Sequence, residues 1–379
     1  YQSQLTYKQK QVRDNLERIA KADCSKMMSI LPSAIQKEYR NKLEFTFSTK
    51  SWKQDYDKDA IDNGAFGFHV PGFFDKVLEI DYCALQSEPS NAIRNHLRDY
   101  YSKRSLPYYN IREHSGLMRN LIVRTSTTGD VMVIVVFAQR SEEIVPLLEN
   151  LRENFPQITS LMYCINEKFN DTLGDQDIKC FAGKDHIEER MTSFDGKGEL
   201  RFKIRPKTFY QTNSLQAEKL YHQAAEFAGI TKDDIVYDLY TGCGTIANYV
   251  ASLSKKVVGI EYVEDAVEDA RLNSEFNNIN NTTFFAGDMA KILTEEFIEQ
   301  NGRPDVIITD PPRAGMAESV INQLLATKAR KIVYISCNPA TQARDLVLLQ
   351  SKYAVGRIRP VDMFPHTQHV ENIVELILK

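Results

Sequence analysis

The stretch that decides the fold is Asp234-Ile235-Val236-Tyr237-Asp238-Leu239-Tyr240-Thr241-Gly242-Cys243-Gly244-Thr245-Ile246-Ala247. It starts as an apolar, strand-like run, turns at two glycines and continues with a helical pattern. Glycine permits a tight turn and lets the backbone approach a ligand closely. The stretch therefore predicts the first strand, the ligand-binding turn and the first helix of a doubly wound α/β domain.

The same alternation continues to the C-terminus. Strands are expected at 234–240, 256–262, 282–286, 305–310 and 331–336, with helical segments between them. Two further strands, 355–363 and 370–378, have no helix between them, so we expect them to pair as an antiparallel hairpin. The sequence thus predicts an α/β fold over residues 205–379, with a seven-stranded, doubly wound, Rossmann-like sheet.

Residues 1–204 have a different, mixed character. An amphipathic helix is expected at 7–20, and strand-like patterns dominate from 43 to 202. Ser126-Thr127-Thr128-Gly129-Asp130 separates two apolar runs, which is typical of a hairpin. We therefore expect a smaller α+β domain over residues 1–204 before the α/β domain of residues 205–379, with the boundary at 204/205.

Composition limits the class of protein. The chain has 379 residues, 42% of them hydrophobic and 26% charged, as in soluble globular proteins. It contains no apolar run of about 18 residues, so we expect no transmembrane helix and no membrane partner. Six cysteines without a Cys-x-x-Cys pair indicate a reducing cytoplasm.

The distribution of charge points to nucleic acid at one place. The net charge is −4, yet residues 94–124 carry seven Lys and Arg against two acidic residues. Tyr100, Tyr101, Tyr108 and Tyr109 lie among these bases. Tyrosines in such a setting either stack on unpaired RNA bases or pack into a core, and the sequence leaves both readings open.

Acidic side chains at strand ends suggest the cofactor. The spacing Gly242-x-Gly244-x-x-Ala247 suits both NAD and S-adenosylmethionine. Asp238 would repel a pyrophosphate but attract the positive charge of a sulfonium cofactor. Glu261 is placed to accept ribose hydroxyl protons, and Asp288 to accept an adenine amine. These acids favour S-adenosylmethionine.

Two further groups end the fourth and fifth strands. Asp310, followed by Pro311-Pro312-Arg313, and Cys337 should both face the cofactor, because ligands of open α/β sheets bind at the carboxyl ends of the strands. Carbon 5 of uracil becomes nucleophilic when a thiolate adds to carbon 6. This chemistry makes Cys337 a candidate nucleophile.

Such a reaction also needs a base that removes the proton from carbon 5. Glu371, at the start of the last strand, is the predicted base. His369 is a competing candidate and His366 a weaker one, since loop histidines are more often surface hydrogen-bonding groups.

Several motifs resemble those of the RNA uracil-C5 methyltransferases that use S-adenosylmethionine. They are Phe209–Asn213, Asp238–Thr245, Asp310-Pro311-Pro312-Arg313-Ala314-Gly315, Ser336–Pro339 and His369-Val370-Glu371. The resemblance implies that Cys337 is the nucleophile and Glu371 the base, and that Asp310 also lies near the target uracil. The residues it assigns to the cofactor are Gln211, Tyr240, Thr245, Glu261, Asp288 and Asp310.

The resemblance points to the 23S ribosomal RNA branch of this family, with a uridine in the T-loop of tRNA as the alternative target. Enzymes of that branch typically carry an N-terminal OB-like RNA-binding module and three cysteines that bind a 4Fe-4S cluster with a distant fourth. Ile80-Asp81-Tyr82-Cys83 resembles the segment of the fourth ligand. We expect the chain to begin just after the other three, so that Cys83 binds iron only in a longer protein. The alternative is a packed cysteine in a cluster-free relative.

Two readings from other classes stay open at this point. An NAD-dependent dehydrogenase explains neither Cys337 nor Asp310, and a non-catalytic RNA-binding protein gives no reason for the groups at the strand ends. The sequence indicates no obligate protein partner. It leaves open the target uridine, the number of target sites and the oligomeric state.

Overall fold

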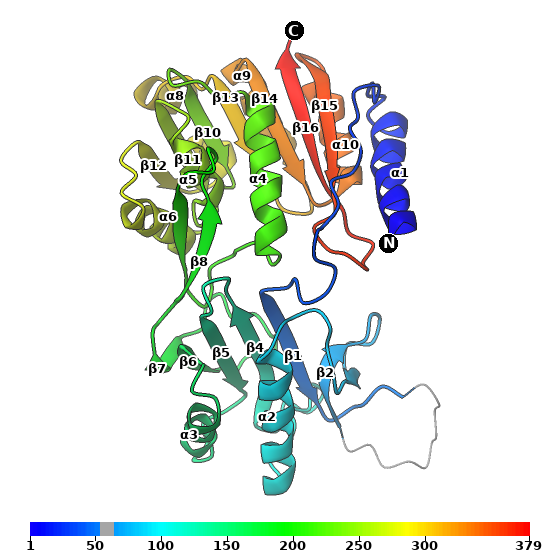
Figure 1. Cartoon of the computed structure of the whole chain (residues 1–379), viewed down its shortest axis with the longest axis vertical. Coiled ribbons are helices and arrows are strands. Elements are labelled where there is room, and N and C mark those ends of the chain that lie inside the picture. The colour runs from blue at the N-terminus through cyan, green and yellow to red at the C-terminus, as the bar shows by residue number, and fades with distance from the viewer. Residues whose placement is uncertain (54–63) are drawn as a thin grey trace. The chain divides into compact units, whose positions relative to one another are not determined.

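The computed structural model describes residues 1–53 and 64–379, which form two compact units (Figure 1). Unit 1 comprises Tyr1–Gln36, Arg190–Lys203 and Thr208–Lys379, and unit 2 comprises Lys37–Glu189 and Ile204–Lys207. This division departs from the expected boundary at 204/205, chiefly because the first 36 residues group with unit 1. No helix of the described residues has the length and apolarity to cross a membrane.

Unit 1 is built on a seven-stranded sheet of strand order β12-β11-β10-β13-β14-β16-β15. The strands are β10 (Ile235–Leu239), β11 (Lys256–Glu261), β12 (Thr282–Ala286), β13 (Val306–Thr309), β14 (Lys331–Ser336), β15 (Tyr353–Val361) and β16 (Glu371–Leu378). The strands from β10 to β14 pair in parallel, and β16 runs antiparallel to both β14 and β15. The predicted α/β sheet with its terminal hairpin is confirmed.

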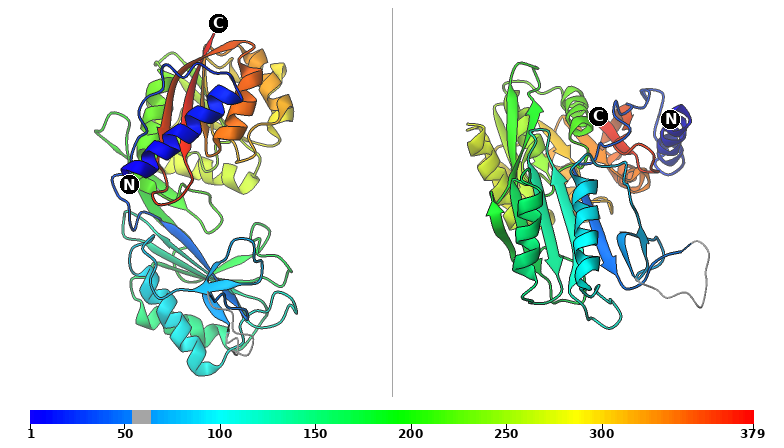
Figure 2. Two further views of the ribbon diagram at one scale, coloured as in Figure 1. Left: turned by 90° about the vertical axis from the view of Figure 1, so that its right-hand side faces the viewer. Right: turned by 60° about the horizontal axis from the view of Figure 1, so that its bottom comes forward.

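Two groups of helices cover this sheet. The first group is α4 (Ser214–Ala228), α5 (Thr245–Ala251) and α6 (Glu264–Phe276), and the second is α1 (Gln2–Arg18), α9 (Glu318–Thr327) and α10 (Pro339–Leu349). The short helices α7 (Met289–Ile292) and α8 (Glu295–Asn301) follow β12. Figure 2 shows α1 lying alongside α10. Crossovers on both faces are what a doubly wound sheet requires.

The N-terminal segment joins unit 1 because its apolar residues are buried there. Leu5, Val12 and Leu16 of α1 belong to the core of this unit. The chain after α1 then follows the edge of β15, where the Leu31 N–H donates to the Pro360 carbonyl at 2.8 Å. The sequence predicted an amphipathic helix, but the pattern could not indicate which sheet the helix covers.

Unit 2 has the predicted α+β architecture. Its sheet has the order β3-β2-β1-β4-β5-β6-β7. The strands are β1 (Lys42–Ser48), β2 (Ala65–His69), β3 (Val77–Glu79), β4 (Met118–Thr125), β5 (Val131–Phe137), β6 (Ser160–Ile165) and β7 (Ile178–Gly183), and the helices are α2 (Ser90–Arg104) and α3 (Ile144–Asn154). β4 and β5 form the predicted hairpin. A separate two-stranded sheet consists of β8 (Ile187–Thr192) and β9 (Glu199–Ile204).

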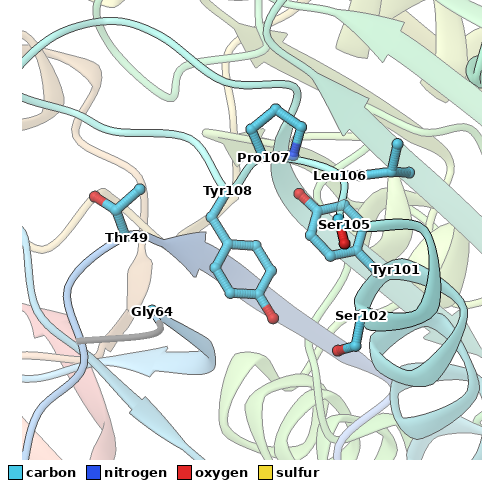
Figure 3. Close-up of a pocket in the computed structure, with 8 residues that line it drawn as sticks. All are labelled: Thr49, Gly64, Tyr101, Ser102, Ser105, Leu106, Pro107 and Tyr108. Atoms are coloured by element: carbon cyan, nitrogen blue, oxygen red, sulfur yellow. The ribbon is translucent and has the colours of Figure 1, made fainter. Parts of the chain in front are cut away.

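The aromatic and basic segment of unit 2 is largely core. Tyr101 is 2% exposed and Tyr109 is 6% exposed, while Arg94 and Arg119 are buried. The rings of Tyr101 and Tyr108 stack with centroids 4.9 Å apart, beside a cavity of about 330 Å³ (Figure 3). The sequence left open whether these tyrosines stack on RNA bases or pack into the core. Tyr101 and Tyr109 pack into the core, because buried rings are not free to stack on RNA bases.

The turn after β10 uses its two glycines for different reasons. Gly244 has a φ of +78°, and a Cβ at this position would lie 2.9 Å from the Cβ of Ala270. Gly242 has a φ of +54°, but a Cβ there would meet no described atom within 4 Å. Gly244 is therefore required by both the backbone and the packing of α6, and Gly242 by the backbone alone.

This difference predicts two unequal losses of stability. Gly242→Ala should lower the free energy of unfolding by about 1–2 kcal/mol, the cost of a left-handed alanine. Gly244→Ala should lower it by about 2–5 kcal/mol, because overpacking is added to the same strain. Urea denaturation of the two variants measures both values. Equal losses would contradict the packing role of Gly244.

Candidate active site

Asp238 lies near the end of β10 and is completely buried. Its Oδ2 accepts hydrogen bonds from the Thr241 hydroxyl (2.5 Å) and the Ala247 N–H (3.0 Å). Its Oδ1 is buried without a hydrogen-bond partner among the described residues. Burial raises the pKa of Asp238 to about 7, although the two hydrogen bonds oppose this shift and Glu261 adds to it. A ligand that brings a positive charge or a donor to Oδ1 would complete this site.

Glu261 ends β11, and backbone amides hold its carboxylate beside the glycine turn. Oε2 accepts a hydrogen bond from the Gly242 N–H at 3.1 Å. Oε1 accepts from the N–H groups of Tyr262 (2.8 Å) and Val263 (3.0 Å). Asp288, after β12, caps the N-terminus of α7. Two carboxylates thus stand at the ends of neighbouring strands, as the sequence predicted.

The Phe209–Asn213 motif also reaches the glycine turn. The Cys243 thiol donates to the Phe209 carbonyl, with Sγ and O 3.4 Å apart, and lies 3.3 Å from the Thr245 hydroxyl. The Phe209 ring is exposed, whereas Gln211 is nearly buried. Tyr240 adopts a left-handed φ of +63° at the end of β10. The structure therefore places Glu261, Thr245 and the backbone of Phe209 at the glycine turn.

The pairing of β14 with β16 brings Cys337 and Glu371 together. The register places Ser336 opposite Asn372. Because the strands are antiparallel, Cys337 and Glu371 occupy the next position on each chain and lie side by side. Asp310 directly follows β13, which pairs with β14 on its other side. Three predicted catalytic or substrate-contacting groups therefore meet at one end of the sheet.

A buried amide pair fixes this spacing, and sequence reasoning missed it. The Asn372 side chain donates to Gln342 Oε1 at 2.7 Å, and Gln342 Nε2 donates to the Tyr334 carbonyl at 3.0 Å. Both amides are fully buried, and they tie α10 to β14 and β16. The available signal was an asparagine directly after Glu371, at the start of a strand whose other residues apart from Glu375 are apolar. A buried amide needs hydrogen-bond partners, so such a residue predicts a tertiary contact.

The acidic groups of this site repel one another. Burial raises the pKa of Glu371, and the charge of Asp310 adds to the shift. Burial likewise raises the pKa of Asp310, with a contribution from Asp238. No side chain or amide of the described residues donates to the carboxylate of Asp310 or Glu371. Burial and mutual repulsion thus raise both pKa values, and a positive charge bound nearby would oppose these shifts.

The Cys337 thiol shares this environment. Its pKa is raised to about 11 by burial and by the carboxylates of Glu371 and Asp310. The guanidinium of Arg313 lowers it only partly. A thiol in this state is a poor nucleophile near neutral pH. A positive charge bound near the thiol would lower this pKa.

Tyr221 of α4 is a further residue that the sequence did not indicate. It is buried, and its pKa is raised well above the usual value by burial and by Asp310, Cys243 and Asp238. Its hydroxyl consequently stays a neutral hydrogen-bond donor beside the acids. Tyr221 lies between Leu220 and Ala224 in a helical pattern that carries no sign of the acids influencing its hydroxyl.

The other candidates lie elsewhere. His366 is exposed, and its ring nitrogen lies 3.2 Å from the Gln4 amide nitrogen. Cys83 is buried in unit 2, where its N–H donates to Asn91 Oδ1 at 2.8 Å. The described residues contain no group of three His, Cys, Asp or Glu arranged to hold a metal ion. The role of Cys83 as a cluster ligand stays a prediction for a longer protein.

Two buried glutamates of β16 predict opposite effects of pH on stability. Glu375 is ion-paired with Arg357 and Lys331, both at 2.8 Å. Burial raises its pKa, but the hydrogen bonds from these two groups prevail and lower it to about 2. Glu375 thus stabilises the fold when charged. Glu371 has a raised pKa, so the stability it contributes at low pH is lost as the pH rises through its folded-state pKa.

Glu371→Gln should therefore melt progressively higher than the parent as the pH rises from 5 to 9, by roughly 3–8 °C at the upper end. Glu375→Gln should melt lower than the parent over this range, because it leaves two cations without their partner. Thermal unfolding at a series of pH values measures both effects. A Glu371→Gln variant less stable than the parent at pH 9 would contradict the raised pKa.

Comparisons with known proteins agree with this geometry. The tRNA (uracil-5-)-methyltransferase family model matches residues 172–379, which is more than half of the chain. The chain is 54% identical over 389 residues to an uncharacterized RNA methyltransferase of Bacteroides thetaiotaomicron, with 100% of this chain and 84% of that protein covered. It is 52% identical over 391 residues to another from Porphyromonas gingivalis, with 100% and 82% covered.

A solved structure supports the same conclusion. The Pyrococcus abyssi tRNA (uracil-54, C5)-methyltransferase in complex with S-adenosyl-L-homocysteine aligns with a TM-score of 0.77 at 28% identity, covering 100% of this chain and 83% of that one. These findings confirm the resemblance seen in the motifs and set aside a dehydrogenase or a non-catalytic protein. The chain belongs to the tRNA (uracil-5-)-methyltransferase family and is an RNA methyltransferase.

Proposed function

We propose that this enzyme transfers a methyl group from S-adenosylmethionine to carbon 5 of a specific uridine in 23S ribosomal RNA, with Cys337 as the nucleophile and Glu371 as the base. The observation that carries the proposal is the β14–β16 register, which sets a thiol beside a carboxylate at the end of the sheet. Methylation at carbon 5 of uracil needs both groups at one ring.

The turn after β10 suits S-adenosylmethionine. Asp238 Oδ1 is buried without a partner among the described residues, and the space next to Gly242 is open to a ligand. The residues that would hold the cofactor are Gln211, Tyr240, Thr245, Glu261, Asp288 and Asp310. When bound, S-adenosylmethionine supplies an electrophilic methyl group and a positive charge on sulfur. That charge would lower the raised pKa values of the neighbouring acidic groups.

The first step of the proposed reaction is the addition of Cys337 to the uracil ring. Cys337 reacts as the thiolate, its proton having passed to solvent water, and an electron pair of its sulfur forms the bond to carbon 6 of the uracil. The electron pair of the 5,6 double bond moves toward oxygen 4, and carbon 5 of the resulting enolate becomes the nucleophile. Asp310 would orient the ring from the neighbouring strand end.

The last step restores the ring. Once carbon 5 carries the methyl group, Glu371 accepts the proton from carbon 5. The electron pair of that C–H bond re-forms the 5,6 double bond, and the bond between carbon 6 and the Cys337 sulfur breaks to release the thiolate. The raised pKa of Glu371 suits this step, because a basic carboxylate accepts a carbon-bound proton more readily.

We also propose a cytoplasmic location, which suits an enzyme that modifies RNA. The motif resemblance supports 23S ribosomal RNA. A tRNA uridine is the second candidate, since the Pyrococcus abyssi relative is a tRNA (uracil-54, C5)-methyltransferase. We also propose that Cys83 is the fourth ligand of a 4Fe-4S cluster in a longer protein, which iron analysis of that protein would test; absence of iron would overturn it.

Replacing either catalytic residue should stop the reaction at a different point. Cys337→Ala should abolish 5-methyluridine formation while cofactor affinity stays within about twofold, because the thiol lies outside the glycine turn. Glu371→Gln should accumulate a covalent RNA–protein adduct, since the thiolate cannot leave while carbon 5 keeps its proton. Denaturing electrophoresis with labelled RNA detects the adduct.

Glu375→Gln is the matched control for this experiment. It changes a buried glutamate of the same strand that is ion-paired with Arg357 and Lys331. At a temperature where the variant is folded, no adduct should accumulate. Release of methylated RNA from Glu371→Gln at the parent rate would assign the base to another residue.

The identity of the RNA can be tested in cells. Deleting the gene should remove 5-methyluridine from a defined position of 23S ribosomal RNA and leave tRNA unchanged. Mass spectrometric mapping of both RNAs measures this. Loss of the modification from tRNA alone would overturn the ribosomal assignment and support the tRNA alternative.

A further inference from the structure

The loop that joins β15 to β16, residues 362–370, ends at the proposed base. The strand register pairs Val361 with Glu371. Asp362, the first residue of the loop, therefore stands next to the strand position of Glu371. Any group that fixes Asp362 also restrains the end of β16 from which the Glu371 carboxylate projects.

A buried ion pair fixes Asp362 from the other end of the sequence. Lys8 of α1 is 4% exposed and Asp362 is fully buried, and Lys8 Nζ lies 2.5 Å from Asp362 Oδ1. Asp362 Oδ2 accepts a hydrogen bond from the Tyr1 hydroxyl at 2.5 Å. Lys8 also donates to the Phe364 carbonyl at 3.0 Å. One helix thus holds both the first side chain and the third carbonyl of the loop.

Further hydrogen bonds hold the rest of the loop. Gln4, also on α1, accepts from the His366 N–H at 3.1 Å. Asn213, which caps α4, donates to the Met363 carbonyl at 2.9 Å. The Asp362 N–H donates to the Leu31 carbonyl at 2.9 Å. Figure 1 shows the N-terminal end of α1 next to this loop.

Stability alone gives a weak reason for this arrangement. Removing a lysine and an aspartate from water is costly, and a pair of apolar side chains of similar volume is often at least as stabilising. Buried ion pairs can instead fix one geometry among several. Here the fixed geometry is that of the loop leading into Glu371.

We propose that α1 positions the base of the reaction: Lys8, through Asp362, holds the 362–370 loop so that the Glu371 carboxylate reaches the proton on carbon 5. The inference rests on the proposed role of Glu371. Lys8 is a positioning residue, because its ammonium group contacts Asp362 and the Phe364 carbonyl. Its loss should slow the removal of the proton and leave the earlier addition of Cys337 intact.

The test uses a neutral pair that leaves no buried charge unpaired. In the double variant Lys8→Met/Asp362→Asn, we expect kcat to fall roughly 10–100-fold, because a displacement of about 1 Å has effects of this size. The KM values for S-adenosylmethionine and RNA should stay within about twofold. The covalent RNA adduct should accumulate, as in Glu371→Gln. Lys10→Met, on the exposed face of α1, is the control and should behave like the parent.

The outcomes separate this inference from the proposed function. If Glu371→Gln traps the adduct but the double variant turns over at the parent rate, the positioning role is overturned and the role of Glu371 stands. If the double variant loses activity together with cofactor affinity or folded protein, without an adduct, the pair is only structural and the inference fails. If Glu371→Gln traps no adduct, the base assignment falls and the inference falls with it.

Discussion

The antiparallel pairing of β14 with β16 is the constraint on which the site depends. If β16 ran parallel to β14, its first residue, Glu371, would lie at the opposite end of the sheet from Cys337, which follows the carboxyl end of β14. The hairpin formed by β15 and β16 reverses the direction of that strand and brings its first residue to the cofactor edge. The buried amides of Gln342 and Asn372 then hold this register against slippage. The placement of Glu371 beside Cys337 is thus a consequence of sheet topology.

The electrostatics of the site complement its geometry. Asp238, Asp310 and Glu371 carry raised pKa values because burial and mutual repulsion disfavour their charges. Such an arrangement costs stability, as strained or charged active sites commonly do. A cationic cofactor would relieve the repulsion and favour the thiolate of Cys337 at the same time. In the proposed mechanism, cofactor binding and activation of the Cys337 thiol would therefore occur together.

The sequence predicted the catalytic unit well because its signals are local. Apolar runs, glycines and strand-end acids identified the sheet, the turn and the positions of Cys337 and Glu371. The features that the sequence did not predict depend on contacts between segments that are far apart in the chain. Lys8 and Asp362 are 354 positions apart, and no local pattern relates them. Likewise, Tyr101 is aromatic and flanked by bases in the sequence, but only the packing of unit 2 shows that it is buried.

In the proposed mechanism, Cys337 bonds to carbon 6 of a uridine whose carbon 5 then loses its hydrogen to a base. The most direct measurement uses RNA in which the target uridine carries fluorine at carbon 5, because a base cannot remove fluorine as it removes a proton. With the parent enzyme and S-adenosylmethionine, the methylated adduct should persist, and peptide mass spectrometry should find it on Cys337. An adduct on another cysteine such as Cys243, or free methylated RNA with no adduct, would contradict this mechanism.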